Sequence, residues 1–159
     1  SIYGLHYMNY QINLIDGLNT SQILVGLDLG TKTIGIAVSD RLKIIATPIS
    51  TIHRKGTKKD LLMMKEILNE YEIGGFVLGL PISLDNTENK LSQLVRNFNI
   101  NLKAYFEKPS VMWDERFSSD VIFKEMRKFN LGQKKIKSKL DQQSAAYILQ
   151  GYLDRYRNN

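Results

Sequence analysis

Apolar and polar positions alternate between short runs that predict strands and periodic stretches that predict helices. Five runs rich in aliphatic and β-branched residues predict strands, at 23–29, 33–39, 44–52, 76–80 and 110–114. Short polar turns join the first three runs, at Gly30-Thr31-Lys32 and at Asp40-Arg41. Three consecutive strands with such short connections predict an antiparallel meander.

Helical spacing takes over between the later strands. A helix is predicted over 58–72, and Gly74-Gly75 is expected to end it. A second helix is predicted from apolar positions between Leu91 and Leu102, with its cap in the turn at 85–87. Ser118 or Ser119 caps a third helix that Gly132 ends, and Ser138 opens a last one. The order βββαβαβα, with one further C-terminal helix, predicts an α/β fold: a mixed five-stranded sheet with helices on both faces.

Composition narrows the class of protein. A chain of 159 residues with 43% apolar and 24% charged residues is typical of one globular domain. Residues 1–20 show no sustained period and are expected to be a flexible extension before a domain at 21–159. The chain has no cysteine, which excludes zinc-thiolate sites, iron–sulfur clusters and a cysteine nucleophile. No apolar run reaches the roughly 20 residues of a membrane span, and residues 1–20 lack a signal-peptide layout.

Positive charge is concentrated in one segment. The formal net charge is +6, and residues 124–139 hold seven basic side chains against the single acid Glu125, so the remainder is neutral overall. Such a basic strip is the electrostatic footprint of a nucleic-acid partner, although a solvated lysine-rich loop has the same pattern.

Asp28 is the acid with the most apolar sequence neighbours. It lies inside the apolar strand 23–29, where an ionised carboxylate is costly unless it is paired or binds a metal. Gly26 and Gly30 on either side allow a backbone or a phosphate to approach closely. An edge-strand position facing water, or an acid capping the turn, is the plainer alternative.

Two further positions hold acids in separate elements. Asp114-Glu115-Arg116 ends a strand, where α/β sheets build sites, although adjacent acids on a strand point to opposite faces. Asp141 lies in the first turn of the predicted last helix, where the helix dipole also favours an acid. Scattered carboxylates suit Mg²⁺ or Mn²⁺, and two such ions can cleave phosphodiesters. Lys32 follows the Gly30 turn, at a place where it can contact phosphate.

Five ordered motifs together resemble a known family. They are Gly26-Leu27-Asp28-Leu29-Gly30-Thr31-Lys32 with 34–40, Val77-Leu78-Gly79-Leu80-Pro81 with Asp85, Val95-Arg96-Asn97-Phe98, Asp114-Glu115-Arg116-Phe117-Ser118-Ser119, and Asp141 with Ala145-Ala146 and 148–154. This set resembles the YqgF family, also called Holliday-junction-resolvase-like proteins or pre-16S rRNA nucleases, over residues 24–154. The family usually has Arg at the position of Thr33 and Gly at that of Asn86, and the first change removes a phosphate contact.

The resemblance implies a ribonuclease-H-like fold, a cytoplasmic location and processing of the 5′ end of 16S rRNA precursors in ribosome biogenesis. It implies a hydrolase acting on ester bonds through two metal ions, Mg²⁺ or Mn²⁺. Its catalytic acids map to Asp28, Glu115 and Asp141, with Asp114 as an alternative metal ligand to Glu115. The side chains expected to contact nucleic acid are Lys32, Arg116, Lys134, Lys135, Lys137 and Lys139.

Three other functions remain open from the sequence. A Holliday-junction resolvase would act on DNA as a dimer, whereas RNA processing by a monomer is preferred. A noncatalytic nucleic-acid or ribosome-binding module would use the basic strip but has no need for Asp28. Residues 28–31 also resemble the phosphate hairpin of actin-like ATPases and sugar kinases, but a second such hairpin is absent from the sequence.

Overall fold

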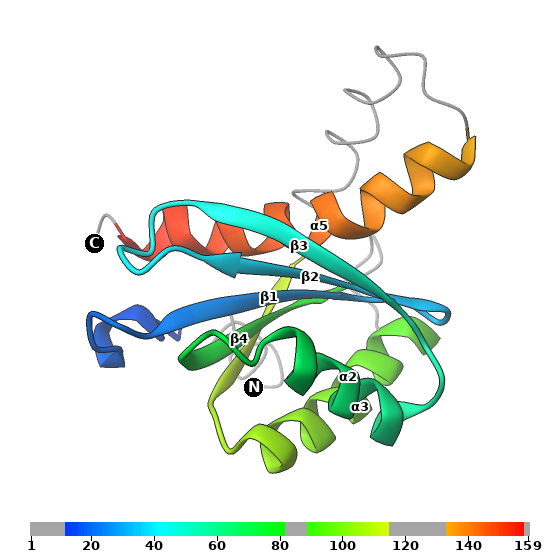
Figure 1. Cartoon of the computed structure of the whole chain (residues 1–159), viewed down its shortest axis with the longest axis horizontal. Coiled ribbons are helices and arrows are strands. Elements are labelled where there is room, and N and C mark those ends of the chain that lie inside the picture. The colour runs from blue at the N-terminus through cyan, green and yellow to red at the C-terminus, as the bar shows by residue number, and fades with distance from the viewer. Residues whose placement is uncertain (1–11, 82–88, 115–132, 158–159) are drawn as a thin grey trace.

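The computed structural model describes residues 12–81, 89–114 and 133–157, and for residues 133–142 it describes the backbone alone. Five strands form one sheet in the order β3-β2-β1-β4-β5 (Figure 1). Antiparallel pairs join β1 to β2 and β2 to β3, whereas β1, β4 and β5 are parallel. The predicted meander, the two crossovers and the mixed α/β sheet are therefore confirmed. The strands are β1 (Ile23–Leu29), β2 (Thr33–Ser39), β3 (Ala46–His53), β4 (Ile73–Leu80) and β5 (Ser110–Asp114).

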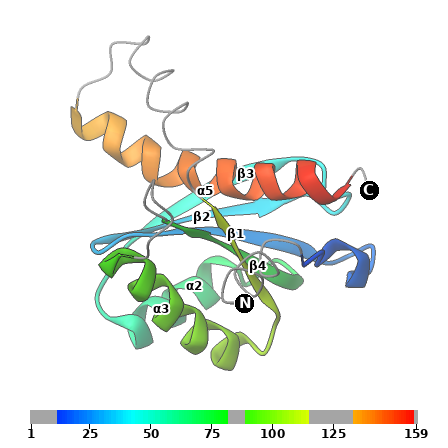
Figure 2. The same ribbon diagram turned by 180° about the vertical axis from the view of Figure 1, so that it is seen from behind.

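Helices cover both faces of the sheet. On one face lie α2 (Thr57–Ile67) and α3 (Lys90–Phe106), and on the other lies α5 (Gln133–Arg157) (Figures 1 and 2). A 3-10 turn, η1 (Ile15–Gly17), precedes β1. The C-terminal half of α5 lies along the sheet, while its N-terminal half rises away from it (Figure 1).

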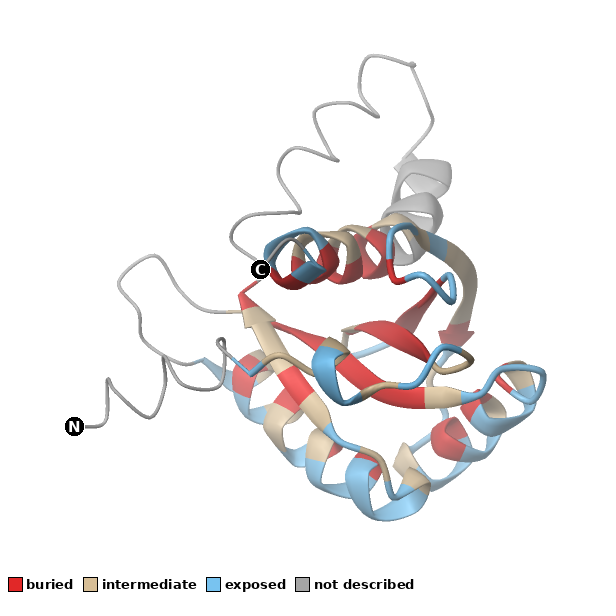
Figure 3. Ribbon diagram, turned by 90° about the vertical axis from the view of Figure 1, so that its left-hand side faces the viewer, coloured by how far each residue is buried: buried red, intermediate tan, exposed pale blue. Residues whose placement is uncertain are grey.

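The strands are apolar along their length because both of their faces are covered. Alternate β1 residues, such as Val25 and Leu27, pack with α2 and α3, and Leu24 packs with α5. Figure 3 shows buried positions on the sheet and on the inward sides of the helices. The core is thus two apolar layers separated by one sheet.

The end of α2 differs from the prediction. The helix ends at Ile67 rather than at residue 72, and Gly74 and Gly75 lie inside β4 rather than stopping a helix. A Cβ at Gly74 would lie 2.3 Å from a methyl of Leu18, so that side chain would have to shift, and one at Gly75 would lie 3.0 Å from a methyl of Leu14 and 3.1 Å from the carbonyl oxygen of Pro109. The glycines therefore let the segment before β1 pack closely on the strand.

Several predicted element starts were also wrong, among them that of β4, which begins at Ile73 rather than at residue 76. β3 begins at Ala46 rather than at residue 44, because the Asp40 carboxylate accepts the backbone N–H groups of Ile44 and Ile45 and holds them in the loop. The cap of α3 is Asn89, whose side chain accepts the N–H of Ser92.

The last helix begins at Gln133, not at Ser138. Lysine is a good helix former, so the basic segment extends the helix instead of forming a loop. The helix predicted to follow Ser118 or Ser119 lies outside the described residues.

Candidate functional site

The carboxyl ends of three parallel strands meet at one edge of the sheet. β4 lies between β1 and β5 and runs in the same direction as both. Asp28 is the second-last residue of β1, and Asp114 is the last residue of β5, where it pairs with Leu80 of β4. The structure thus places two predicted acids at the edge where parallel sheets commonly carry their sites.

These two acids belong to opposite faces of the sheet. Side chains alternate along a strand, so Asp28 shares a face with Leu24, which packs with α5. Asp114 shares a face with Met112, which packs against the α2 and α3 side of the core. Asp28 is half-buried, and Asp114 is 7% exposed. The alternation separates Asp114 from Asp28, although both lie at the same edge.

Contact between α5 and β1 depends on Gly26. A Cβ built on Gly26 would lie 2.7 Å from the Cβ of Leu149 and 2.8 Å from the carbonyl oxygen of Ala145. Ala145 and Leu149 are one helical turn apart and therefore lie on one stripe of α5. This stripe lies over the same face of β1 to which Asp28 belongs.

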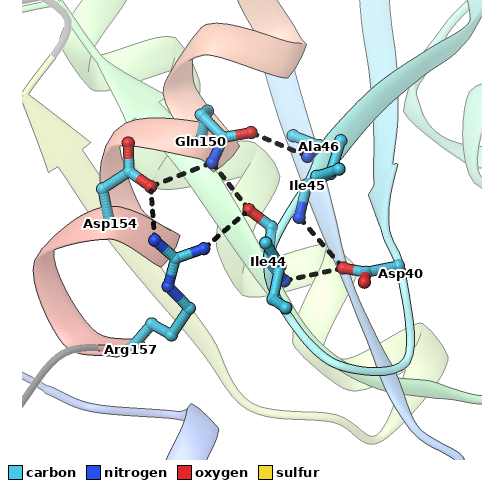
Figure 4. Close-up of polar contacts among 7 residues, drawn as sticks. All are labelled: Asp40, Ile44, Ile45, Ala46, Gln150, Asp154 and Arg157. Atoms are coloured by element: carbon cyan, nitrogen blue, oxygen red, sulfur yellow. Dashed lines mark hydrogen bonds and ion pairs between the residues drawn. The ribbon is translucent and has the colours of Figure 1, made fainter.

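The direction of α5 determines where Asp141 lies. Near the C-terminal end of the helix, the Gln150 amide accepts the N–H of Ala46 at 2.9 Å and donates to the carbonyl of Ile44 at 2.8 Å (Figure 4). Ala46 begins β3, which runs in the same direction as β1 because both are antiparallel to β2. The helix therefore runs antiparallel to β1, and the backbone of Asp141, one turn before Ala145, lies toward the carboxyl end of β1.

The turn that follows Asp28 presents Lys32 at the surface. The N–H of Gly30 donates to the carbonyl of Thr33 at 2.8 Å and closes the turn. Thr31 and Lys32 are both exposed. Lys32 therefore lies at the edge of the sheet to which Asp28 belongs, as a contact to a phosphate group would require.

Two residues that the sequence did not reveal hold this turn. Arg54 forms an ion pair with Asp60, with 3.0 Å between Nε and Oδ2, and donates from Nη1 to the carbonyl of Gly30 at 3.2 Å. Asp60 is fully buried in the first turn of α2, four residues before the buried Met64. A carboxylate on the buried stripe of a helix needs a partner, and that was the signal available in the sequence.

Several predicted residues lie outside what the structure describes. Glu115 and Arg116 are among them. Lys134, Lys135, Lys137 and Lys139 belong to the first turns of α5, where only the backbone is described. Within the described ranges, no three His, Asp or Glu side chains gather closely enough to hold a metal ion.

Known proteins with similar sequences point to one family. The family model described as "RuvX: Holliday junction resolvase" matches residues 22–155. A protein of Rhodobacter capsulatus named "Putative pre-16S rRNA nuclease" is 45% identical over 132 residues, covering 83% of each chain. A protein of the same name from Paramagnetospirillum magneticum is 40% identical over 141 residues, covering 89% of this chain and 91% of its own.

The fold has a known counterpart as well. A structure of Thermus thermophilus RuvC in complex with a Holliday junction substrate matches with a TM-score of 0.51 at 11% identity, over 84% of this chain and 95% of that one. This likeness confirms the expected ribonuclease-H-like fold. Among the described helices, none is long and apolar enough to cross a membrane. From its match to the family model over residues 22–155 and its similarity to these relatives, the chain belongs to the RuvX family of Holliday-junction-resolvase-like proteins.

Proposed function

We propose that this protein is a metal-dependent nuclease that hydrolyses phosphodiester bonds during 5′-end processing of the 16S rRNA precursor in the cytoplasm. The observation that carries the proposal is the position of Asp28, a half-buried carboxylate at the carboxyl end of β1 on the face that α5 covers. Relatives at 40–45% identity bear a pre-16S rRNA nuclease name, which supports RNA as the substrate.

The acids that support this chemistry are Asp28, Glu115 and Asp141. Met112 and Asp114 share the α2 and α3 face of β5, which argues against Asp114 as the partner of Asp28. We therefore assign the metal-ligand role to Glu115 in preference to its neighbour. Asp141 is assigned because its backbone lies one turn from Ala145, on the part of α5 that leads toward the end of β1.

The donor set fits a hard divalent cation. Carboxylate oxygens drawn from separate elements are the ligands that Mg²⁺ and Mn²⁺ prefer, and we propose two ions held by these three acids. Such ions, when bound, supply an activated water and stabilise the departing oxygen. The exposed Lys32, with Arg116 and the lysines at the start of α5, holds the nucleic-acid backbone by contacts to phosphate oxygens.

A second candidate function is resolution of four-way DNA junctions. The description of the matching family favours it. A junction resolvase cuts two strands symmetrically and so needs a dimer with two sites, whereas trimming an RNA end needs one site. We propose the monomeric RNA nuclease as the principal function, and the two differ in substrate and in oligomeric state.

Cleavage assays with end-labelled substrates test the proposal. The substrates are a precursor 16S rRNA fragment, an unrelated single-stranded RNA and a four-way DNA junction, each with Mg²⁺, Mn²⁺ or EDTA. We expect metal-dependent cleavage of the precursor fragment near its 5′ end, and a loss of at least about 100-fold in Asp28→Asn. Preferential cleavage of the junction would instead establish the resolvase.

Glu70→Gln is the matched control for Asp28→Asn. It also neutralises one carboxylate, but Glu70 is exposed and lies in the turn before β4, at the opposite edge of the sheet. The control should cut at the wild-type rate. Equal cutting by wild type and Asp28→Asn would show that the site is wrong, and binding without cleavage by both would favour a noncatalytic module.

A further inference from the structure

Arg54 links the turn after β1 to the helical layer beneath the sheet. Its guanidinium pairs with Asp60 at 3.0 Å and donates to the Gly30 carbonyl at 3.2 Å. Its backbone N–H donates to the Lys32 carbonyl at 2.8 Å. The guanidinium carbon also lies 5.5 Å from the ring centre of Phe98 in α3. One residue therefore holds two carbonyl groups of the turn that carries Lys32.

Asp60 holds the guanidinium in place. The Asp60 side chain is fully buried, and that of Arg54 is 11% exposed. The second carboxylate oxygen, Oδ1, accepts the N–H of Lys55 at 2.8 Å, so both oxygens of Asp60 have partners. A buried carboxylate with both oxygens engaged leaves Arg54 little freedom to move.

Three of the five guanidinium N–H groups of Arg54 already have partners and its side chain is only 11% exposed, which leaves little of it for a substrate phosphate. Nε serves Asp60, Nη1 serves Gly30, and Nη2 lies 3.5 Å from the hydroxyl of Thr57. The neighbouring Lys32, by contrast, is exposed. Any influence of Arg54 on nucleic acid therefore passes through the turn.

We propose that Arg54, fixed by Asp60, is a positioning residue that sets the β1–β2 turn so that Lys32 contacts the nucleic-acid backbone beside Asp28. The proposal rests on the nuclease function proposed above, and it adds a residue outside the acid set. Lysine cannot replace arginine here. The planar guanidinium of arginine has several donors and contacts Asp60 and the turn carbonyl at the same time, whereas the single ammonium group of lysine cannot contact both.

Binding to a labelled single-stranded RNA tests this without cleavage. The full chain carries Asp28→Asn, and its affinity is measured by fluorescence anisotropy over a range of salt concentrations. Lys32→Ala should weaken binding about fivefold and lower the salt slope by about 0.7, the value for one phosphate contact on a single strand. Arg54→Lys keeps the net charge, yet it should lower affinity and slope to a similar extent.

The double variant separates positioning from an independent effect. If Arg54 acts through Lys32, then Arg54→Lys should cost little more than a factor of about two once Lys32→Ala is present. Multiplied effects in the double variant would overturn the proposal, as would wild-type affinity and slope in Arg54→Lys alone. Failure of the parent protein to bind either RNA or junction DNA would overturn the nuclease proposal and this one together.

Two more variants guard against a purely structural explanation. Val111→Ala removes core methyl groups on the α5 face of the sheet, opposite the layer that holds Asp60 and Phe98, and it should lower the unfolding midpoint while affinity and salt slope stay unchanged. Asp60→Asn raises the net charge by one and so should strengthen nonspecific attraction. If Asp60→Asn instead weakens RNA binding and lowers the salt slope, the positioning role is supported, even where Arg54→Lys folds poorly. Stronger RNA binding by Asp60→Asn would contradict the positioning role.

Discussion

At the scale of single residues, the hydroxyl of Thr51 is the side-chain polar atom in the described structure that is buried without a hydrogen-bond partner. Thr51 pairs with Gly35, which pairs with Asp28, so the three form one row across the sheet. Thr51→Val should raise the free energy of unfolding by about 1 kcal/mol, because it removes a desolvated hydroxyl at nearly constant volume. Urea unfolding checks this, and a stability loss in the variant would indicate a partner for the hydroxyl.

Asp40 gives a pH dependence that belongs to the same scale. Burial raises its pKa, but the N–H groups of Ile45 and Ile44 outweigh this, and the pKa of the folded state lies below the ordinary 3.8. A depressed pKa contributes stability above the unfolded-state value and loses it as the pH falls through the folded-state value.

Asp40→Asn should therefore cost about 0.5 kcal/mol at neutral pH, a modest value because the residue is exposed. The difference between wild type and variant should shrink as the pH falls below about 4. Denaturant unfolding at neutral and acidic pH measures it. A difference that stays constant across this range would mean that the carboxylate charge has no part in holding the loop.

The sequence reveals a single residue in unusual surroundings more readily than it reveals two residues that interact in the fold. Asp28 is conspicuous because its neighbours in β1 are apolar. Asp60 lies on the buried stripe of α2 and so needs a partner, but only the fold shows that this partner is Arg54. Whether Asp114 or Glu115 shares the face of Asp28 also depends on the register of β5, which no local pattern in the sequence specifies.

At the scale of elements, the contact between β1 and α5 is the one that the site depends on most. Gly26→Ala would place a methyl group against the backbone oxygen of Ala145, which cannot rotate away as a side chain can. We expect a loss of about 1–3 kcal/mol in stability, with slower cleavage because α5 carries the proposed metal ligand Asp141. Thermal unfolding and the precursor cleavage assay measure the two effects.

Gly17→Ala is the matched control for this substitution. Nothing lies within 4 Å of a Cβ at Gly17, so the added methyl meets no neighbour. Its stability should stay within about 0.5 kcal/mol of wild type. If the two glycine variants behaved alike, close packing of α5 on β1 would not be what requires Gly26.

The predictability of elements followed the strength of their patterns. The bounds of β1, β2 and β5 agree with the predicted runs because a strand covered on both faces is apolar throughout. Helix ends were less predictable, because glycine can either end a helix or allow a close approach within a strand. Gly74 and Gly75 resembled a stop signal, but they serve a close approach inside β4 that involves residues far away in the chain.

At the scale of the whole molecule, part of the predicted N-terminal extension is packed on the domain. Leu14, Ile15 and Leu18 contact the apolar cluster beneath α5. The amine of Lys43 donates to the carbonyl of Asn19 at 2.8 Å. Sequence periodicity could not show this, because the segment has no regular element long enough to produce a period. We propose that residues 12–20 belong to the folding unit formed by the rest of the domain.

Tyr152 tests that proposal. Its hydroxyl accepts the N–H of Leu14 at 2.7 Å and donates to the carbonyl of Ile12, while its ring is buried within the α5 cluster. Tyr152→Phe leaves the ring in place but deprives the Leu14 amide of its acceptor, which should cost about 1–2 kcal/mol. Tyr105→Phe, at a side chain that is 41% exposed, is the control and should cost nearly nothing.

If residues 12–20 are part of the folding unit, Tyr152→Phe will also speed proteolytic cleavage within this segment under native conditions, because the loosened segment opens more often. Equal unfolding midpoints and equal cleavage rates in the two tyrosine variants would instead make the segment an appendage that adds nothing to the stability of the domain.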